Sequence, residues 1–277
     1  LMDDLNKIYA TTTGHISDEE ASSFLVRDAL GQVIESTAKK LSDNKVEITV
    51  LDPSTIDVRN IYTVESNNYR AGKVVMRNIL NHSKFAYNGS NLGVEYKPYE
   101  SVFRVWAPTA TKVSVALYDD AGEYNESGLV TNHEGGNEYE MSRSDEGLWT
   151  LALYGDKENR YYMYKVEFAD GTVNYAVDPY AKAVSANGQR GVVIDLSSTN
   201  PEGFDETERP AMVNPTDAML YELHVRDFSI DEKSGTVNKG KFLAFTEEGT
   251  TLLGNDGVKT GIDHLVELGI THVHLLP

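Results

Sequence analysis

The chain has 277 residues, a formal net charge of −18 and no cysteine. Its length suits two or three domains, and the missing cysteines exclude disulfides, thiolate zinc sites and cysteine nucleophiles. The acidic charge argues against nucleic acid or an anionic membrane surface as a partner, and no apolar stretch is long enough for a membrane span, so we expect no membrane insertion.

Residues 1–90 are predicted to form a small β-sandwich. Short segments alternate apolar and polar residues, as Val46, Ile48 and Val50 do in KVEITV, and the turn clusters SDN and DPS separate such segments. His15 and His82 stand alone in this region. An isolated histidine is more often structural than a ligand, so we expect no chemical site here.

Residues 91–205 are predicted to form a second β-sandwich. The segments SVFRVWAP, KVSVALY and RYYMYKVEF alternate apolar and polar residues, and YEMSR and LWTLALY follow the turns DDAG and SDEG. Asp170 and Gly171 suit a tight hairpin between RYYMYKVEF and VNYAV. Several short strands with turns at near-regular spacing are typical of a sandwich.

Residues 215–277 have a different pattern, in which a strand, a helix and a second strand follow one another. The first strand is AMLYELHVRDFSI, a polar loop covers residues 231–259, the helix is GIDHLVELG and the second strand is ITHVHLLP. Gly269 stands where helices commonly end. The helix has an apolar stripe of Ile262, Leu265, Val266 and Leu268. Such a βαβ unit places its two strands parallel.

The first strand of this unit has one apolar and one ionisable face, made by Met219, Tyr221, Leu223 and Val225 and by Glu222, His224 and Arg226. In a (β/α)8 barrel the outer helices cover one face of each strand and the barrel interior covers the other. The catalytic mouth lies at the C-terminal ends of the strands. We therefore expect Arg226 and Asp227 near that mouth, and Glu222 and His224 in an interior polar network.

Six segments occur in this order along the chain: FRVWAPTATKVSVALY, YYMYKVEF, AVDPYAKAVSANGQRGVVIDL, YELHVRDFSIDEKSG, NKGKFLAFTE and GIDHLVELGITHVHLLP. Together they resemble the type I pullulanases, starch-debranching enzymes of glycoside hydrolase family 13, over about residues 79–277. The resemblance implies two β-sandwich (Ig-like) domains, the second similar to carbohydrate-binding module family 48. It places the first β-α-β unit of a (β/α)8 TIM barrel at residues 215–277.

The resemblance also implies an activity for the intact parent, which hydrolyses α-1,6-glucosidic branch linkages in pullulan, amylopectin and glycogen-derived dextrins with retention of configuration. A retaining glycosidase needs two carboxyl groups about 5 Å apart. In this family those groups lie on later barrel strands, beyond Pro277, and the tyrosine-rich signature that usually follows the second strand is missing. We therefore assign no catalytic residue and expect the chain alone to be inactive.

Two parallel strands leave open edges and bare apolar faces, so residues 215–277 are expected to be unstable alone. We expect the remaining barrel polypeptide as a companion chain or a missing portion. Two alternatives stay open. One is an isoamylase- or branching-enzyme-like relative, and the other is a non-catalytic surface protein that binds glycans.

Few residues are candidates for contact with a branched α-glucan. They are Arg226, Asp227 and Trp149. Adjacent strand residues point to opposite faces, so Arg226 and Asp227 are not expected to act as one pair. A role in bracing neighbouring strands through charge-assisted hydrogen bonds is favoured for each of them. Trp106 and Trp149 lie in alternating strands, where core packing or a domain interface is the favoured role. Glycogen-binding members of module family 48 carry a tryptophan just after the DG turn, where this chain reads TV. That departure argues against independent sugar binding.

No metal or cofactor is assigned. His272 and His274 form an HVH pair, a pattern that binds metal in other barrel hydrolases, but His272 lies near the beginning of its strand, away from the expected mouth. The acidic loop LYDDAGEYNE offers oxygen ligands without EF-hand spacing, so calcium is possible. The extra N-terminal domain favours an extracellular or bacterial cell-surface location over the cytoplasm.

Overall fold

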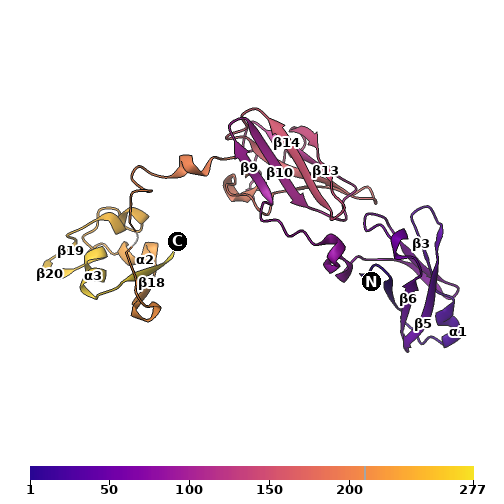
Figure 1. Ribbon diagram of the computed structural model, residues 1–277. Helices are drawn as coiled ribbons and strands as arrows, with labels where there is room; N and C mark the ends of the chain where they lie inside the picture. Colours follow the sequence, from indigo (N-terminus) through magenta and orange to yellow (C-terminus); the bar gives the residue numbers. More distant parts are fainter. Residues whose placement is uncertain (209) are drawn as a thin grey trace. The chain divides into compact units, whose positions relative to one another are not determined.

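The computed structural model describes residues 1–208 and 210–277 (Figure 1). The chain divides into two compact units, Leu1–Asn200 and Pro201–Pro277. Antiparallel sheets dominate the first unit, whereas the second combines short strands and short helices. Within the described residues no helix is long and apolar enough to cross a membrane.

Two four-stranded antiparallel sheets form the first sandwich. One sheet has the order β1-β2-β6-β5 and the other the order β4-β3-β7-β8. Buried side chains from both sheets belong to one hydrophobic cluster, so the two sheets share a core, as a sandwich requires. The elements are β1 (Met2–Asp4), β2 (Lys7–Thr11), α1 (Asp18–Ser22), β3 (Leu25–Arg27), β4 (Val33–Ile34), β5 (Ser36–Ser42), β6 (Lys45–Val50), β7 (Thr63–Ser66) and β8 (Tyr69–Lys73).

The alternation in β6 decides which of its side chains enter this core. Val46, Ile48 and Val50 are at most 2% exposed, as predicted. Burial of each such side chain contributes roughly 1.5–3 kcal/mol. Glu47 lies on the opposite face, where its carboxylate accepts a hydrogen bond from Lys7 Nζ at 2.8 Å. The period of two in the sequence therefore fixes both the core and the polar face of the strand.

The second sandwich also has two antiparallel sheets, with the orders β13-β14-β10-β9 and β12-β11-β15-β16; β17 pairs with β15 as well. Figure 1 shows β9, β10, β14 and β13 side by side in one layer. The strands are β9 (Gly93–Lys97), β10 (Glu100–Trp106), β11 (Lys112–Tyr118), β12 (Asn137–Glu140), β13 (Ser142–Arg143), β14 (Leu148–Tyr154), β15 (Tyr161–Glu167), β16 (Val173–Ala176) and β17 (Gly191–Val192).

Aromatic side chains fill the core of the second sandwich. Phe103 of β10 and Tyr162 of β15 are both fully buried, and their rings meet edge to face with centroids 5.2 Å apart. The predicted hairpin between β15 and β16 is confirmed, and Gly171 occupies its turn at φ +81, where an L side chain would be strained.

In the second unit β18 (Leu220–His224) and β21 (His272–Leu276) pair in parallel, as predicted. Between them lie α2 (Val225–Ser229), the 3-10 helix η7 (Phe242–Thr246), the hairpin β19 (Thr251–Leu252) and β20 (Asn255–Lys259), and α3 (Gly261–Glu267). Gly269 ends α3 at φ +74. Its N–H donates to Val266 O, and the Ile270 N–H donates to Leu265 O, both at 3.0 Å. These two bonds form a Schellman motif, which satisfies the last helical carbonyls.

Three predictions for the second unit are wrong in part. The strand expected over residues 218–230 ends at His224, whose Nδ1 accepts a hydrogen bond from the Arg226 N–H at 3.2 Å as the chain turns into α2. The polar loop expected over residues 231–259 contains η7 and the β19-β20 hairpin. On α3 Leu265 is buried, whereas Val266 and Leu268 of the predicted stripe are exposed.

Other short 3-10 helices lie in the connections of both units: η1 (Pro53–Thr55), η2 (Asn78–Asn81), η3 (Ser83–Phe85), η4 (Ala186–Gly188), η5 (Leu196–Thr199) and η6 (Pro215–Asp217).

Candidate functional site

An apolar groove of about 810 Å³ lies in the first unit, where residues 80–92 pass the second sandwich. Its lining residues are Leu80, Asn81, Phe85, Ala86, Tyr87, Leu92, Val105, Trp106, Pro179 and Tyr180. Trp106 is 37% exposed and Tyr180 54% exposed, so each presents part of its ring to solvent. Exposed aromatic rings can stack on the apolar faces of sugar rings.

The ring of Trp106 is held in place by its indole nitrogen. Trp106 Nε1 donates to Phe85 O at 2.9 Å and to Glu146 O at 3.1 Å. These bonds join β10 to η3 before the sandwich and to the turn that precedes β14. Trp106 therefore links the second sandwich to the segment before it, which agrees with an interface, one of the two roles expected of it.

A buried carboxylate positions Tyr180 at the other side of the groove. Asp178 is 3% exposed, and its Oδ2 accepts hydrogen bonds from Tyr162 Oη at 2.8 Å and from Tyr164 Oη at 3.4 Å. Its Oδ1 accepts from the Tyr180 N–H at 2.8 Å. Burial raises the pKa of Asp178 above the ordinary carboxyl value, and these three hydrogen bonds oppose that rise.

The same burial acts on both tyrosines of this network. The pKa values of Tyr162 and Tyr164 are raised, first by desolvation and then by the negative charge of Asp178. Both hydroxyls therefore stay protonated and act as donors. The network is structural, because it fixes the backbone before Tyr180, and the residues that line the groove include no carboxylate, histidine or lysine.

Trp149 lies inside the second sandwich and not on its surface. It is 4% exposed, belongs to the hydrophobic core, and donates from Nε1 to Ala107 O at 2.9 Å. Core packing, the favoured role of this tryptophan, is confirmed. As a candidate for substrate contact, Trp149 has no ring face available to a ligand in this conformation.

A long acidic loop covers part of the outer face of the β12-β11-β15-β16 sheet, around Tyr118. Arg190 is fully buried and lies over the Tyr118 ring, with its guanidinium carbon 3.6 Å from the ring centroid. Its Nη1 donates to Asp120 O at 3.0 Å and its Nη2 donates to Asn132 O at 2.7 Å. Further along the loop, the His133 ring stacks on Tyr175. This loop is therefore an ordered cover, fixed from beneath by one arginine.

The acidic residues of that loop do not assemble a metal site. No group of three or more His, Asp or Glu side chains that could hold an ion occurs within residues 1–208 and 210–277. Asp119 is paired with Arg160, and Asp120 Oδ1 accepts from Arg190. Calcium binding stays a prediction that no feature of the loop supports further.

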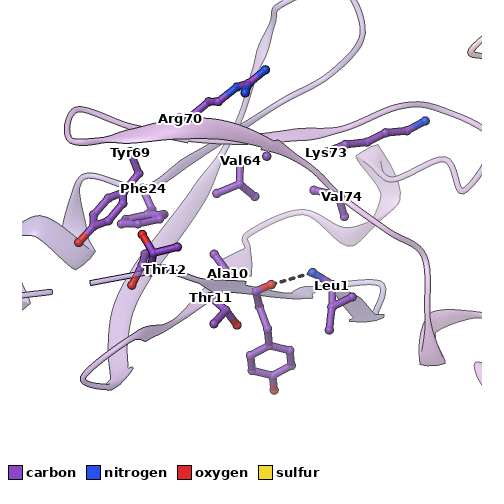
Figure 2. Close-up of a pocket in the computed structure, with 13 residues that line it drawn as sticks. Leu1, Ala10, Thr11, Thr12, Phe24, Val64, Tyr69, Arg70, Lys73 and Val74 are labelled. Carbon is purple, nitrogen blue, oxygen red and sulfur yellow. Dashed lines mark hydrogen bonds between the residues drawn. The ribbon is translucent and has the colours of Figure 1, made fainter. Parts of the chain in front are cut away.

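The first sandwich has a pocket of about 320 Å³ between β2 and β8 (Figure 2). Thr12, Phe24 and Val64 line its interior, and Figure 2 shows Arg70 and Lys73 extending from β8 away from Thr12. The amino group of Leu1 donates to Tyr9 O at 2.7 Å at one end. The lining includes no carboxylate and no histidine.

In the second unit Arg226 and Asp227 lie on α2, not on the strand where they were expected. Both side chains are exposed, and Arg226 Nη1 donates to Asp227 Oδ1 at 3.2 Å. The expectation that the two point to opposite faces is wrong, because it depended on a strand geometry that ends at His224. Their proximity to a catalytic mouth stays a prediction.

The other polar candidates of this unit meet across the parallel strand pair. Glu222 of β18 pairs in register with His274 of β21, and His274 Nδ1 lies 3.2 Å from Glu222 Oε2. His272 Nδ1 lies 2.8 Å from Thr271 Oγ1. Each histidine of the HVH pair therefore has a protein partner, and neither belongs to a metal-binding group of the described residues.

Residues 91–181 match the family carbohydrate-binding module 48 (isoamylase N-terminal domain). The chain is 37% identical over 205 residues to a pullulanase of Bacillus subtilis (strain 168), a match that covers 73% of this chain and 26% of the relative. It is 34% identical over 203 residues to pullulanase 1, chloroplastic, of Arabidopsis thaliana, covering 70% of this chain and 19% of that relative. The chain thus spans about a quarter or less of these relatives.

Solved structures extend the similarity. A pullulanase from Bacillus acidopullulyticus matches with a TM-score of 0.84 at 30% identity, over 100% of this chain and 46% of that chain. A pullulanase from Anoxybacillus sp. LM18-11, complexed with maltotetraose, matches with a TM-score of 0.71 at 32% identity, over 100% of this chain and 37% of that chain. A pullulanase from Paenibacillus barengoltzii, in complex with maltohexaose and α-cyclodextrin, matches with a TM-score of 0.60 at 45% identity, over 70% of this chain and 28% of that chain.

The chain is homologous to pullulanases. The relatives bearing that name are glycoside hydrolases, and the second sandwich of this pullulanase homologue is a carbohydrate-binding module of family 48, hereafter the CBM48 sandwich. The similarity predicted from the sequence is thereby confirmed.

Two structural residues of this pullulanase homologue were not found by sequence reasoning. Asp178 and Arg190 both lie in the segment AVDPYAKAVSANGQRGVVIDL, which was used only as part of the resemblance. An ionisable residue between apolar neighbours, such as Asp178 after AV or Arg190 before GVV, is the signal that could have marked a buried polar anchor.

Proposed function

We propose that this chain is the N-terminal part of a pullulanase, a retaining glycosidase that hydrolyses α-1,6-glucosidic branch linkages in pullulan, amylopectin and glycogen-derived dextrins. The extent of the similarity carries this proposal, because the match to solved pullulanases covers all of this chain and not only the module at 91–181. A non-catalytic glycan-binding protein would be expected to share the module alone.

The second unit would contribute the first β-α-β part of a (β/α)8 catalytic barrel. The parallel pairing of β18 with β21, with α3 between them in the chain, supports this assignment. Leu220, Leu275 and Leu276 on the two strands are exposed. Further barrel strands and helices, in the same polypeptide or in a companion chain, would cover these apolar side chains.

Catalysis would depend on carboxyl groups contributed by that remaining barrel polypeptide. Asp227 is exposed and paired with Arg226, whereas the general acid of a glycosidase stands in a shielded site. We therefore give Arg226 and Asp227 a bracing role and assign no catalytic residue within this chain. The chain by itself is expected to be inactive.

Pullulan hydrolysis tests the proposal. The polypeptide encoded by the whole gene should release maltotriose from pullulan, because cleavage at each α-1,6 bond frees that unit, and the 277-residue chain should release none. Isoamylase-like activity would instead debranch amylopectin and leave pullulan intact, and a branching enzyme would release no maltotriose. Release by the 277-residue chain would contradict the assignment of catalysis to later residues.

The location of the protein is a separate proposal. We infer an extracellular or cell-surface location from the additional sandwich that precedes the CBM48 sandwich. Fractionation of the producing cells with an antibody to this chain tests it, and recovery only in the cytoplasm would contradict it.

A further inference from the structure

The first strand of the first sandwich, β1, is hydrogen-bonded along both of its edges. On one edge Leu1 and Tyr9 of β2 exchange two hydrogen bonds between main-chain atoms, both 2.7 Å long. On the other edge the Met2 N–H donates to Val75 O and the Arg77 N–H donates to Met2 O, both at 2.9 Å. The segment after β8 therefore runs parallel to β1, and the chain at Met2 joins the two sheets of the sandwich.

Beyond Leu1 the edge of β2 has no neighbouring strand. The backbone groups of successive strand residues point to opposite edges. The Thr12 N–H donates to Asn44 O at 2.9 Å, on the side of β6, so Thr11 faces the same edge as Tyr9. Neither the N–H nor the C=O of Thr11 has a hydrogen-bond partner on that edge among the described residues. This edge is therefore free to pair with another strand.

The chain across from β2 has free backbone groups as well. The Val74 N–H donates to Tyr62 O at 2.8 Å, on the side of β7. Lys73 and Val75 flank this residue, so their backbone groups point to the opposite edge, where Val75 O accepts from Met2. In the part of the chain that the structure describes, the Lys73 C=O and the Val75 N–H have no partner on that edge.

The pocket of Figure 2 lies between these two edges and is hereafter called the strand slot. The amino group of Leu1 stands at one end of it. Its inner wall is apolar, because Phe24 and Val74 are buried and Val64 packs against the same core. Side chains alternate along β1, with Met2 fully buried and Leu1 exposed, so a residue joined to the Leu1 amino group would point into the slot.

The amino group of Leu1 occupies the place of a strand amide. Burial lowers the pKa of this group below its ordinary value, because partial removal from water disfavours the charged form. A peptide N–H in the same place would keep the hydrogen bond to Tyr9 O and would bring no charge into the slot. The surroundings therefore favour an amide over a terminal ammonium group.

We propose that the strand slot binds one extended peptide strand, which is joined to the amino group of Leu1 and continues β1. The free N–H and C=O groups on both sides select a strand, because a strand presents donors and acceptors along both of its edges. The residue next to Leu1 would donate to Lys73 O and accept from the Val75 N–H, and the residue before it would exchange two bonds with Thr11. The added strand would join the two sheets as Met2 does.

Hydrogen exchange of the 277-residue chain with tetrapeptide extensions at Leu1 tests the strand slot. The extension Thr-Val-Thr-Val points its valines inward and should slow exchange of the Thr11 and Val75 amides at least about tenfold. Val-Thr-Val-Thr has the same composition but points its valines outward, so it should slow these amides less than about threefold. Ala38 on β5, the other edge strand of the same sheet, should exchange at the parent rate in both extended proteins.

Thermal unfolding gives a second measurement on the same proteins. Thr-Val-Thr-Val should raise the melting temperature of the first sandwich by about 4 °C or more, and Val-Thr-Val-Thr should raise it less. Equal effects of the two extensions, or no effect of either, would overturn the proposal. A second copy of the chain is the other possible occupant. Protection of Thr11 and Val75 in the unextended chain that increases with protein concentration would assign the slot to that copy and would also overturn the proposal.

Discussion

The Tyr162 hydroxyl donates a 2.8 Å hydrogen bond to Asp178 Oδ2 in the interior of the CBM48 sandwich. The bond links β15 to the segment after β16, across 16 residues of chain. Since both groups are buried, neither can exchange this partner for water. The position of Tyr180 beside the apolar groove depends on this bond, because the same carboxylate accepts the Tyr180 N–H.

Removal of the Asp178 carboxylate should destabilise the first unit. D178A leaves the Tyr162 hydroxyl and the Tyr180 N–H without their acceptor, and the Tyr164 hydroxyl keeps only its 3.4 Å bond to Arg104 O. Each unsatisfied buried group costs about 1–3 kcal/mol, so we expect a loss of about 3 kcal/mol. D178N keeps an oxygen acceptor and removes the buried charge, so it should cost about 1 kcal/mol or less. Urea unfolding followed by tryptophan fluorescence measures both, and equal losses for the two variants would contradict this account.

The unfolding free energies of the parent and of D178N should depend differently on pH, and the sign of the difference can be worked out. Burial raises the pKa of Asp178 in the folded state, so the folded state binds a proton more tightly than the unfolded state does. The contribution of Asp178 to stability is then fullest below the unfolded pKa of about 3.9 and declines as pH rises through the folded value. D178N should lack this decline, which urea titrations at a series of pH values would detect.

Glu47 in the first sandwich should show the opposite dependence. Lys7 and Lys39, at 2.8 and 3.1 Å, lower the pKa of Glu47 to about 2. Its stabilisation is present above the unfolded pKa of about 4.3 and is lost as pH falls towards 2. E47Q should therefore cost about 1 kcal/mol at pH 7, after allowance for solvent screening, and almost nothing at pH 2.

Glu35 provides the control for that measurement, because it is exposed on the connection between β4 and β5. E35Q should leave the unfolding free energy within about 0.5 kcal/mol of the parent at both pH values. A loss on E47Q that is the same at pH 7 and pH 2 would show that the ion pairs with lysine are not its cause.

Arg190 should control the order of the acidic loop over the CBM48 sandwich. R190M removes the donors to Asp120 O and Asn132 O, which lie 70 and 58 residues away in the chain. We expect cleavage within residues 119–136 by a nonspecific protease to become at least tenfold faster, since the loop would open without global unfolding. R190K, which keeps one donor group, should be intermediate.

Arg160 is the matched control, because its guanidinium also pairs with an aspartate of this loop but is partly exposed. R160M should change the cleavage rate by less than twofold, as surface ion pairs contribute little. Equal protection of the parent and R190M would mean that the loop is held by its other contacts.

Gly269 should be required for the end of α3 in the second unit. Its φ of +74 is strained for any L residue, although a Cβ atom there would meet no neighbour within 4 Å. G269A should therefore cost about 1 kcal/mol through backbone strain alone. Hydrogen exchange of the α3 amides measures the effect, and G257A in β20, at a glycine with no positive φ, should leave those amides unchanged.

Local pattern predicted much of this fold. The period of two placed Val46, Ile48 and Val50 in a core, the Asp-Gly pair predicted the β15-β16 hairpin, and the glycine after GIDHLVELG predicted the end of α3. Each of these features depends on interactions within a few residues of chain, and the order of residue types along the chain determines such interactions.

The tertiary structure alone decided where the first strand of the second unit ends and what the ionisable residues do. An alternating pattern continues past His224 in the sequence, but the imidazole of that residue caps α2 and removes Arg226 and Asp227 from the strand. Arg190 gains its partners only when segments more than fifty residues apart meet. The periodicity of the sequence indicates which face of an element is apolar. The partner of a buried charge depends on long-range packing, so the local spacing of residues does not predict that partner.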